Sequence, residues 1–113
     1  MAGKLDIIDG GEALVALITV PVESVDAVSS ALVESRSAAC VNVISGLTSV
    51  YRWKGEVCRD PESLLIVKTN QKNRQSVADV LTEHHPYDEP ELIFLPIASG
   101  SKSYLGWLGE MVK

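Results

Sequence analysis

The sequence predicts one α+β domain in which an antiparallel sheet of four strands carries two helices on one face. Apolar residues recur with strand spacing in four segments and with helix spacing in three, in the order β-α-β-β-α-β-α. The first six segments form the split β-α-β arrangement (βαββαβ), which folds naturally into such a sheet. At 113 residues the chain is long enough for one hydrophobic core and too short for two domains.

The first strand and the first helix adjoin at Pro21. Residues 13–20 (ALVALITV) are continuously apolar, which is typical of a strand covered on both faces. From residue 23 to about residue 37, apolar side chains recur at i, i+3 and i+7, the stripe of an amphipathic helix. We expect residues 1–12 to form a polar N-terminal tail, ahead of a single domain that spans 13–113.

A long β-hairpin follows the first helix. Its first half comprises two strand-like runs, 40–44 and 47–53, and Gly46 between them indicates a bulge because an isolated glycine in a strand often marks one. Lys54 and Gly55 predict a tight turn into a second long strand, which runs from residue 56 to about 69.

The second strand of this hairpin changes character along its length. Pro61 cannot donate a hydrogen bond to a neighbouring strand, so the stretch around it should lie at an edge or an irregularity. Residues 64–67 (LLIV) are apolar on both faces and predict a central position in the sheet.

The remaining elements complete the pattern. Apolar positions between residues 77 and 84 follow helix spacing until Pro86, which stops the helix. Residues 91–95 (ELIFL) form the fourth strand, ended by Pro96, and a C-terminal helix begins at about Ser101.

Strands that are apolar on both faces need a second covering layer, and two helices on one face do not provide it. One short C-terminal helix cannot cover the other face, and a monomer would expose a patch larger than is usual. We therefore expect the chain to form a homo-oligomer that buries this face against copies of itself.

Composition excludes several classes of function. The net charge of −5 argues against nucleic acid as a partner, because proteins that bind the phosphate backbone carry a basic surplus. No apolar run approaches the roughly 20 residues needed to cross a bilayer, and acidic residues near the N-terminus argue against a signal peptide. The two cysteines, Cys40 and Cys58, have no CxxC spacing, so we expect reduced thiols in a cytoplasmic protein.

An ordered set of short motifs spans nearly the whole chain. The chain resembles the CutA family of divalent-cation tolerance proteins in these motifs, over about residues 14–112. They are Ala38-Ala-Cys-Val-Asn42, Gly46, Tyr51-Arg-Trp53 with Gly55, Leu64-Leu-Ile-Val-Lys-Thr69, His85-Pro-Tyr-Asp88, Pro90-Glu91, Leu95-Pro-Ile97 and Tyr104-Leu-x-Trp-Leu108.

The resemblance implies a ferredoxin-like fold, assembled as a homotrimer, and a role in tolerance of copper or other divalent metal ions. The trimer is similar to that of the PII signalling proteins, which implies an alternative role as a module that binds a small ligand in clefts between subunits. The number of subunits, three, comes from the resemblance alone.

Given the resemblance, three residues are candidate metal ligands: Cys40, His85 and Glu91. A thiolate and an imidazole suit Cu(II) or Zn(II), and a carboxylate adds a harder donor. Purely structural roles are the alternatives. Cys40 would be a small buried hydrophobic residue, and His84, next to His85, would be an imidazolium that complements the dipole at the C-terminal end of a helix. Cys58 lies outside the motifs.

Four aromatic residues and one lysine are candidate cleft or interface residues. Tyr51, Trp53, Tyr87 and Trp107 are typical of core and interface anchors, because they bury a large area and keep a polar group. Lys68 interrupts an apolar strand, and the resemblance implies a place near a cleft between subunits, beside a carboxylate or an anion.

An enzyme that uses Cys40 as a nucleophile and His85 as a base is the weakest hypothesis. The sequence offers no third orienting residue and no oxyanion loop. No glycine-rich phosphate loop is present either. We therefore expect a protein without catalytic residues and without an obligatory cofactor, whose ligands are divalent cations such as Cu(II).

Overall fold

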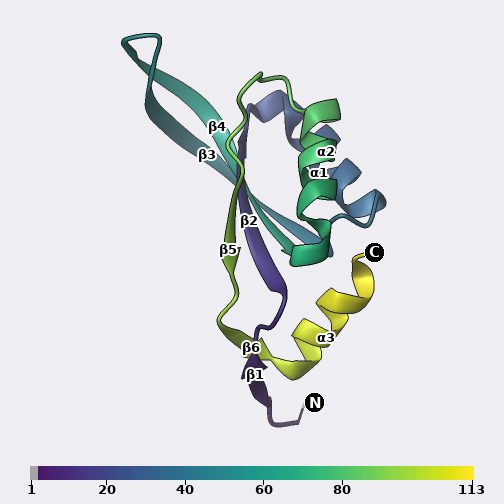
Figure 1. Cartoon of the computed structure of the whole chain (residues 1–113). Coiled ribbons are helices and arrows are strands. Elements are labelled where there is room, and N and C mark those ends of the chain that lie inside the picture. The colour runs from purple at the N-terminus through teal and green to yellow at the C-terminus, as the bar shows by residue number, and fades with distance from the viewer. Residues whose placement is uncertain (1–2) are drawn as a thin grey trace.

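A computed structural model describes residues 3–113 and contains a mixed α+β domain with an antiparallel sheet of four strands (Figure 1). The strand order β3-β4-β2-β5 and the two crossing helices are those of the ferredoxin-like fold, as the sequence predicts. The elements of this unit are β2 (Ala13–Val20), α1 (Val25–Glu34), β3 (Cys40–Trp53), β4 (Glu56–Asn70), α2 (Arg74–His84) and β5 (Ile93–Pro96).

Helices α1 and α2 lie on one face of the sheet, and the main core fills the space between these helices and the sheet (Figure 1). Alternate residues of β2 and β4 point into this core, as expected for strands whose side chains alternate between faces. One-turn 3-10 helices, η1 (Val22–Ser24) and η2 (Gln71–Asn73), lead into the two helices. The buried core consists of Ala16, Ile18, Val20, Val28, Leu32, Ala38, Leu65, Val67, Val77, Val80 and Leu81.

Strands β3 and β4 continue past β2 as a two-stranded arm that projects from the body (Figure 1). The pairing of β4 with β2 ends at Ser63, so Pro61 lies where β4 has only β3 beside it. This confirms the edge position expected for that proline. The β3–β4 register shifts between Ile44 and Leu47, which confirms the bulge, and Gly46 there has a φ of +79°.

An additional small sheet joins the N-terminal segment to the start of the C-terminal helix. Strand β1 (Ile7–Asp9) pairs antiparallel with β6 (Ser99–Ser101), and α3 (Lys102–Met111) follows directly. The residue pattern predicts neither β1 nor β6, because three residues are too few for an alternating pattern to stand out. The polar tail predicted over 1–12 therefore includes a paired segment, and its first two residues, Met1 and Ala2, lie outside the described residues.

The sheet face opposite α1 and α2 is apolar and partly exposed. Cross-strand partners share a face, so the pairs Leu17–Ile66 and Val15–Leu95 place four apolar side chains there. Ile44, Ile93 and Leu95 on this face are exposed. The apolar character of both faces, which the sequence predicted for β2 and β4, is present in the structure.

Candidate functional site

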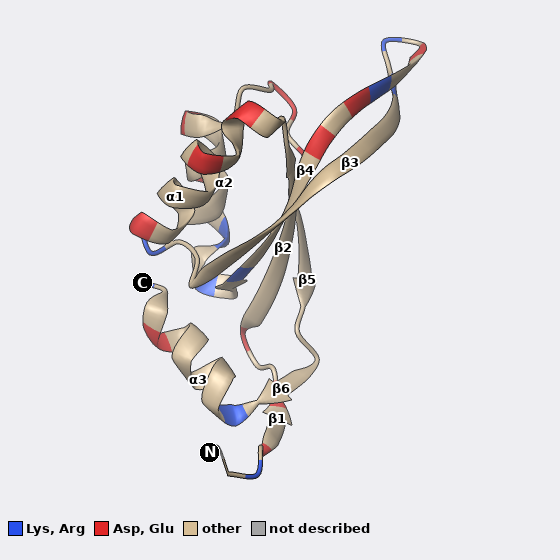
Figure 2. Ribbon diagram, turned by 180° about the vertical axis from the view of Figure 1, so that it is seen from behind, with Lys and Arg blue, Asp and Glu red and all other residues tan. Residues whose placement is uncertain are grey.

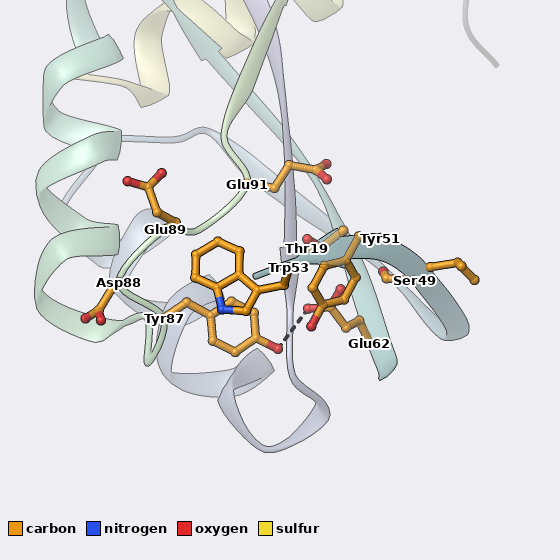
Figure 3. Close-up of a pocket in the computed structure, with 10 residues that line it drawn as sticks. Thr19, Ser49, Tyr51, Trp53, Glu62, Tyr87, Asp88, Glu89 and Glu91 are labelled. Atoms are coloured by element: carbon orange, nitrogen blue, oxygen red, sulfur yellow. Dashed lines mark hydrogen bonds between the residues drawn. The ribbon is translucent and has the colours of Figure 1, made fainter. Parts of the chain in front are cut away.

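A cleft of about 510 Å³ lies at the base of the arm, between the sheet and the loop that joins α2 to β5 (Figure 3). Its wall combines aromatic rings with carboxylates, and both the strands and the loop contribute each kind of group. Strands β2, β3 and β4 supply Thr19, Ser49, Val50, Tyr51, Trp53 and Glu62, and the loop supplies Tyr87, Asp88, Glu89 and Glu91.

Glu62 and Tyr87 form the floor of this cleft. Glu62 is only 5% exposed, and the Tyr87 hydroxyl donates a hydrogen bond of 3.0 Å to its Oε2 (Figure 3). Burial of the phenol, followed by this hydrogen bond to Glu62, raises the pKa of Tyr87 to about 12. Tyr87 therefore remains a protonated hydrogen-bond donor at neutral pH.

Tyr51 makes the equivalent contact on the arm. Its hydroxyl donates to Asp60, and that hydrogen bond, with burial as a smaller cause, raises the pKa of Tyr51 to about 12. A second hollow of about 430 Å³ lies beside the cleft, and both Tyr51 and Tyr87 line it. Figure 2 shows acidic residues of β4 along the arm, and both basic and acidic residues at its tip.

His85 holds the α2–β5 loop against β2. Its ring is buried, and Nε2 lies 2.9 Å from the carbonyl oxygen of Thr19, while Nδ1 accepts a hydrogen bond of 3.2 Å from the Tyr87 backbone N–H. A carbonyl can only accept, so His85 is the neutral tautomer with its proton on Nε2. The ring also packs against that of Tyr87, with centroids 4.8 Å apart and planes tilted by 56°. Both ring nitrogens are therefore engaged with backbone groups.

Cys40 lies in a different part of the sheet, opposite Lys68 in the β3–β4 register. Its Sγ is 3.9 Å from Asn42 Oδ1, to which the Lys68 ammonium also donates. Burial, and then the neighbouring Cys40 thiol, raises the pKa of Tyr104. Cys40 is half-buried within the single subunit.

The three candidate metal ligands do not meet within one subunit. Glu91 lines the cleft and His85 lies beneath it. The cross-strand partner of Cys40 is Lys68, which lies four residues, or roughly 13 Å, further along β4 than Leu64, the partner of Thr19. Cys40 is also two strands away from β2 and three strands away from β5. Across residues 3–113, no three His, Cys, Asp or Glu side chains converge to hold a metal ion.

The candidate cleft residues divide in the same way. Tyr51, Trp53 and Tyr87 all line the cleft. Trp107 instead packs against Tyr104 in α3, with ring centroids 5.6 Å apart and planes tilted by 38°, and Lys68 lies beside Asn42. Glu62, which also lines the cleft, is not among the residues predicted from the sequence. Its only sequence signal is an acid two residues before the apolar run of β4, where the strand enters the body of the sheet.

The comparisons with known proteins agree with this architecture. A family model described as CutA1 divalent ion tolerance protein matches residues 14–111. The chain belongs to this family. None of the helices described in residues 3–113 has the length and apolar character needed to cross a lipid bilayer.

The CutA relatives include bacterial and plant proteins. The divalent-cation tolerance protein CutA of Thermus thermophilus is 52% identical over 97 residues, which cover 85% of this chain and 94% of that protein. The chloroplastic CutA protein of Arabidopsis thaliana is 47% identical over 84% of this chain, which spans only 53% of the plant protein. A solved structure of the Thermus thermophilus protein matches with a TM-score of 0.87 at 48% identity, covering 89% of this chain and 99% of that one.

Proposed function

We propose that this chain acts in divalent-cation tolerance by binding Cu(II) or another divalent metal ion directly, as a homotrimer in the cytoplasm. The observation that carries the proposal is membership of the CutA family, with a relative of that name at 52% identity over most of both chains. The proposal includes no catalytic activity and no nucleic-acid or membrane partner.

The exposed apolar sheet face supports the homotrimer. A patch of this kind on one subunit is typical of a surface that a second copy covers. In light scattering, we expect the purified protein to have three times the subunit mass. Leu95→Arg on this face should reduce the mass, whereas Val33→Arg, on the outer side of α1 with similar exposure (43% against 45%), should not. A stable monomer of the unaltered chain would contradict the proposal.

Cys40, His85 and Glu91 remain the proposed metal ligands. Because they lie apart in one subunit, the proposal requires donors from adjacent subunits, and His85 would have to release one of its two backbone hydrogen bonds. The Cys40 thiol is the strongest candidate, since it is half-buried beside Asn42 and soft enough to select copper or zinc.

Calorimetric titration of the reduced oligomer with Cu(II) and Zn(II) tests the ligand set. We expect about one site per subunit, weakened at least about tenfold in Cys40→Ala, since one ligand to a bound metal is lost. Matched controls are Cys58→Ala for Cys40, His84→Ala for His85→Ala, and Glu83→Gln for Glu91→Gln. Metal binding that is equal in all variants and controls would exclude these three side chains as ligands.

Location is tested separately, because names of relatives differ on it: the Arabidopsis thaliana protein is named chloroplastic and the Archaeoglobus fulgidus structure is titled periplasmic. We expect fractionation of the native cell to place this chain with cytoplasmic markers. Recovery with an organelle or periplasmic fraction would contradict that part of the proposal.

A second candidate function is a PII-like module that binds a small ligand in a cleft of the trimer. The cleft at the base of the arm favours it, since its volume of about 510 Å³ falls within the range of small-molecule sites. A thermal-shift screen of metabolites tests it, because a ligand at 100 times its dissociation constant adds roughly 2.7 kcal/mol to stability. The absence of any stabilising metabolite would leave metal binding as the function.

A further inference from the structure

We propose that the cleft at the base of the arm binds an organic ammonium ion, whose positive charge lies over the rings of Trp53 and Tyr87 and beside the Glu62 carboxylate. This inference rests on the second candidate function and specifies the chemical class of its ligand. Three features of the cleft support it: an unneutralised buried carboxylate, an excess of acidic groups and exposed aromatic faces.

The Glu62 carboxylate is the first feature. A buried charge is costly unless it is paired, yet Glu62 is 95% buried and the structure gives it one neutral partner, the Tyr87 hydroxyl. In the described part of the chain, the contact between a basic and an acidic side chain is His84–Glu83 at 3.9 Å, which lies outside the cleft and leaves Glu62 without a basic partner. A cation entering the cleft would supply the missing counter-charge.

The balance of charge around the cleft is the second feature. Glu62, Asp88, Glu89 and Glu91 contribute acidic groups, and no lysine or arginine of residues 3–113 is among those that line it. Such a lining raises the local concentration of cations and disfavours anions. Nucleotides, phosphates and carboxylic acids are thus poor candidates for this cleft.

The aromatic rings decide between an organic cation and a hydrated metal ion. Trp53 is 49% exposed, and its ring lines the cleft together with those of Tyr51 and Tyr87 (Figure 3). The alkyl groups of an organic ammonium ion are weakly hydrated, and they pack on aromatic faces through cation–π attraction. Aromatic cages recognise quaternary ammonium groups in this way. A divalent metal requires several converging donors instead, and residues 3–113 bring no such group together.

Tyr87 positions the carboxylate for this role. Its hydroxyl fixes one oxygen of Glu62, and its backbone N–H is in turn fixed by His85, so the floor of the cleft is arranged before a ligand enters. Preorganised contacts of this kind favour binding because less conformational freedom is lost.

The test uses the purified oligomer and two probes of equal shape: choline, and dimethylbutanol, in which carbon replaces the quaternary nitrogen. Quenching of Trp53 fluorescence, in a Trp107→Phe background that removes the other tryptophan, reports binding. We expect choline to bind at least about tenfold more tightly than its neutral isostere, because only the cation gains the ring and carboxylate attraction.

Glu62→Gln keeps the shape of the side chain and removes its charge, so we expect choline binding to weaken at least about tenfold. Glu83→Gln, an exposed acid on α2 outside the cleft, is the matched control and should have no effect. Trp53→Phe provides a second variant that keeps a ring, and it should weaken choline binding less than Trp53→Ala; calorimetric titration measures choline binding to these two variants, because neither retains the Trp53 fluorophore. Circular dichroism and light scattering confirm that each variant folds and assembles.

Three outcomes overturn the inference and leave the parent proposal separable from it. Equal binding of choline and dimethylbutanol would retain a small-ligand site but exclude the ammonium class. Equal effects of Glu62→Gln and Glu83→Gln would exclude the cleft as the site. If neither probe binds while the metabolite screen finds an anionic or neutral ligand, the inference fails and the small-ligand function stands.

Discussion

The body and the arm of this molecule use the same two strands in opposite ways. Within the body, β4 lies between β2 and β3 beneath two helices, and Ile18 and Leu65 have no exposed surface. In the arm, the same strand has one neighbour and no helix, and Val57 is 61% exposed. The body is therefore stabilised within the subunit, whereas the conformation of the arm depends on its turn, its hydrogen-bond ladder and whatever packs against it.

Removing core volume should give the largest difference between the two regions. Ile18→Ala deletes a fully buried side chain in β2 and should destabilise the protein by about 4 kcal/mol. Val57→Ala in the arm should change the free energy of unfolding by no more than about 0.5 kcal/mol. Denaturant unfolding measures both, and a similar cost for the two would show that the arm is buried as deeply as the core.

His85 connects the two regions, since it joins β2 to the loop that lines the cleft. His85→Ala removes two hydrogen bonds and leaves the Thr19 carbonyl unsatisfied, so it should cost about 2–3 kcal/mol. The adjacent His84→Ala removes an exposed ring and should cost less than about 0.5 kcal/mol. Equal effects in thermal or denaturant unfolding would contradict the positional role of His85.

The tip of the arm tests the backbone contribution. Lys54 and Gly55 both have positive φ, +49° and +81°, the conformation of a type I′ hairpin turn. Gly55→Ala should cost about 1 kcal/mol, because an alanine is strained at this positive φ. An added Cβ meets no other atom, so backbone strain is the whole of the expected cost. Gly106→Ala, equally free of contacts but inside α3, should instead stabilise by up to about 1 kcal/mol. A shared sign in denaturant unfolding would refute the turn argument.

The smallest effect concerns Tyr51 at alkaline pH. Its folded pKa, about 12, lies above the ordinary value of 10.0, so the stabilisation from this group is complete below pH 10 and is lost as pH rises through 12. Asp60→Asn should lower the pKa of Tyr51 towards its ordinary value, and Glu56→Gln should leave it unchanged. Ultraviolet absorbance of tyrosinate across an alkaline titration measures the difference, and equal curves for the two variants would argue against the Asp60 hydrogen bond.

The fold was predictable because its signals are local. Each of these signals predicts the structure of the residues directly around it: the apolar run from 13 to 20, the spacing of Val28 and Leu32, and the prolines at 61 and 86. The strand at Ile7–Asp9 was not predictable in this way. Its three residues acquire strand structure only through pairing with Ser99–Ser101, which lie some 90 residues further along the chain.

The candidate site was predictable only in part. Tyr51, Trp53 and Tyr87 were selected as large amphipathic rings, and all three line the cleft. Glu62 was overlooked because its burial depends on where the α2–β5 loop lies, and no local pattern encodes that position. The need for a glycine at position 10 was likewise not predictable. A Cβ there would come within 1.7 Å of the Ile97 carbonyl oxygen, which belongs to a segment distant in sequence.

By itself, the sequence determined the order of the elements, the bulge at Gly46, the edge position of Pro61 and the apolar character of both sheet faces. Each of these follows from the spacing and backbone preferences of neighbouring residues. Only the tertiary structure decided that both nitrogens of His85 bond to backbone, that Cys40 lies apart from Glu91, and that Glu62 meets Tyr87. These contacts join segments distant in sequence, and their geometry is set by how the sheet, the helices and the loops pack together.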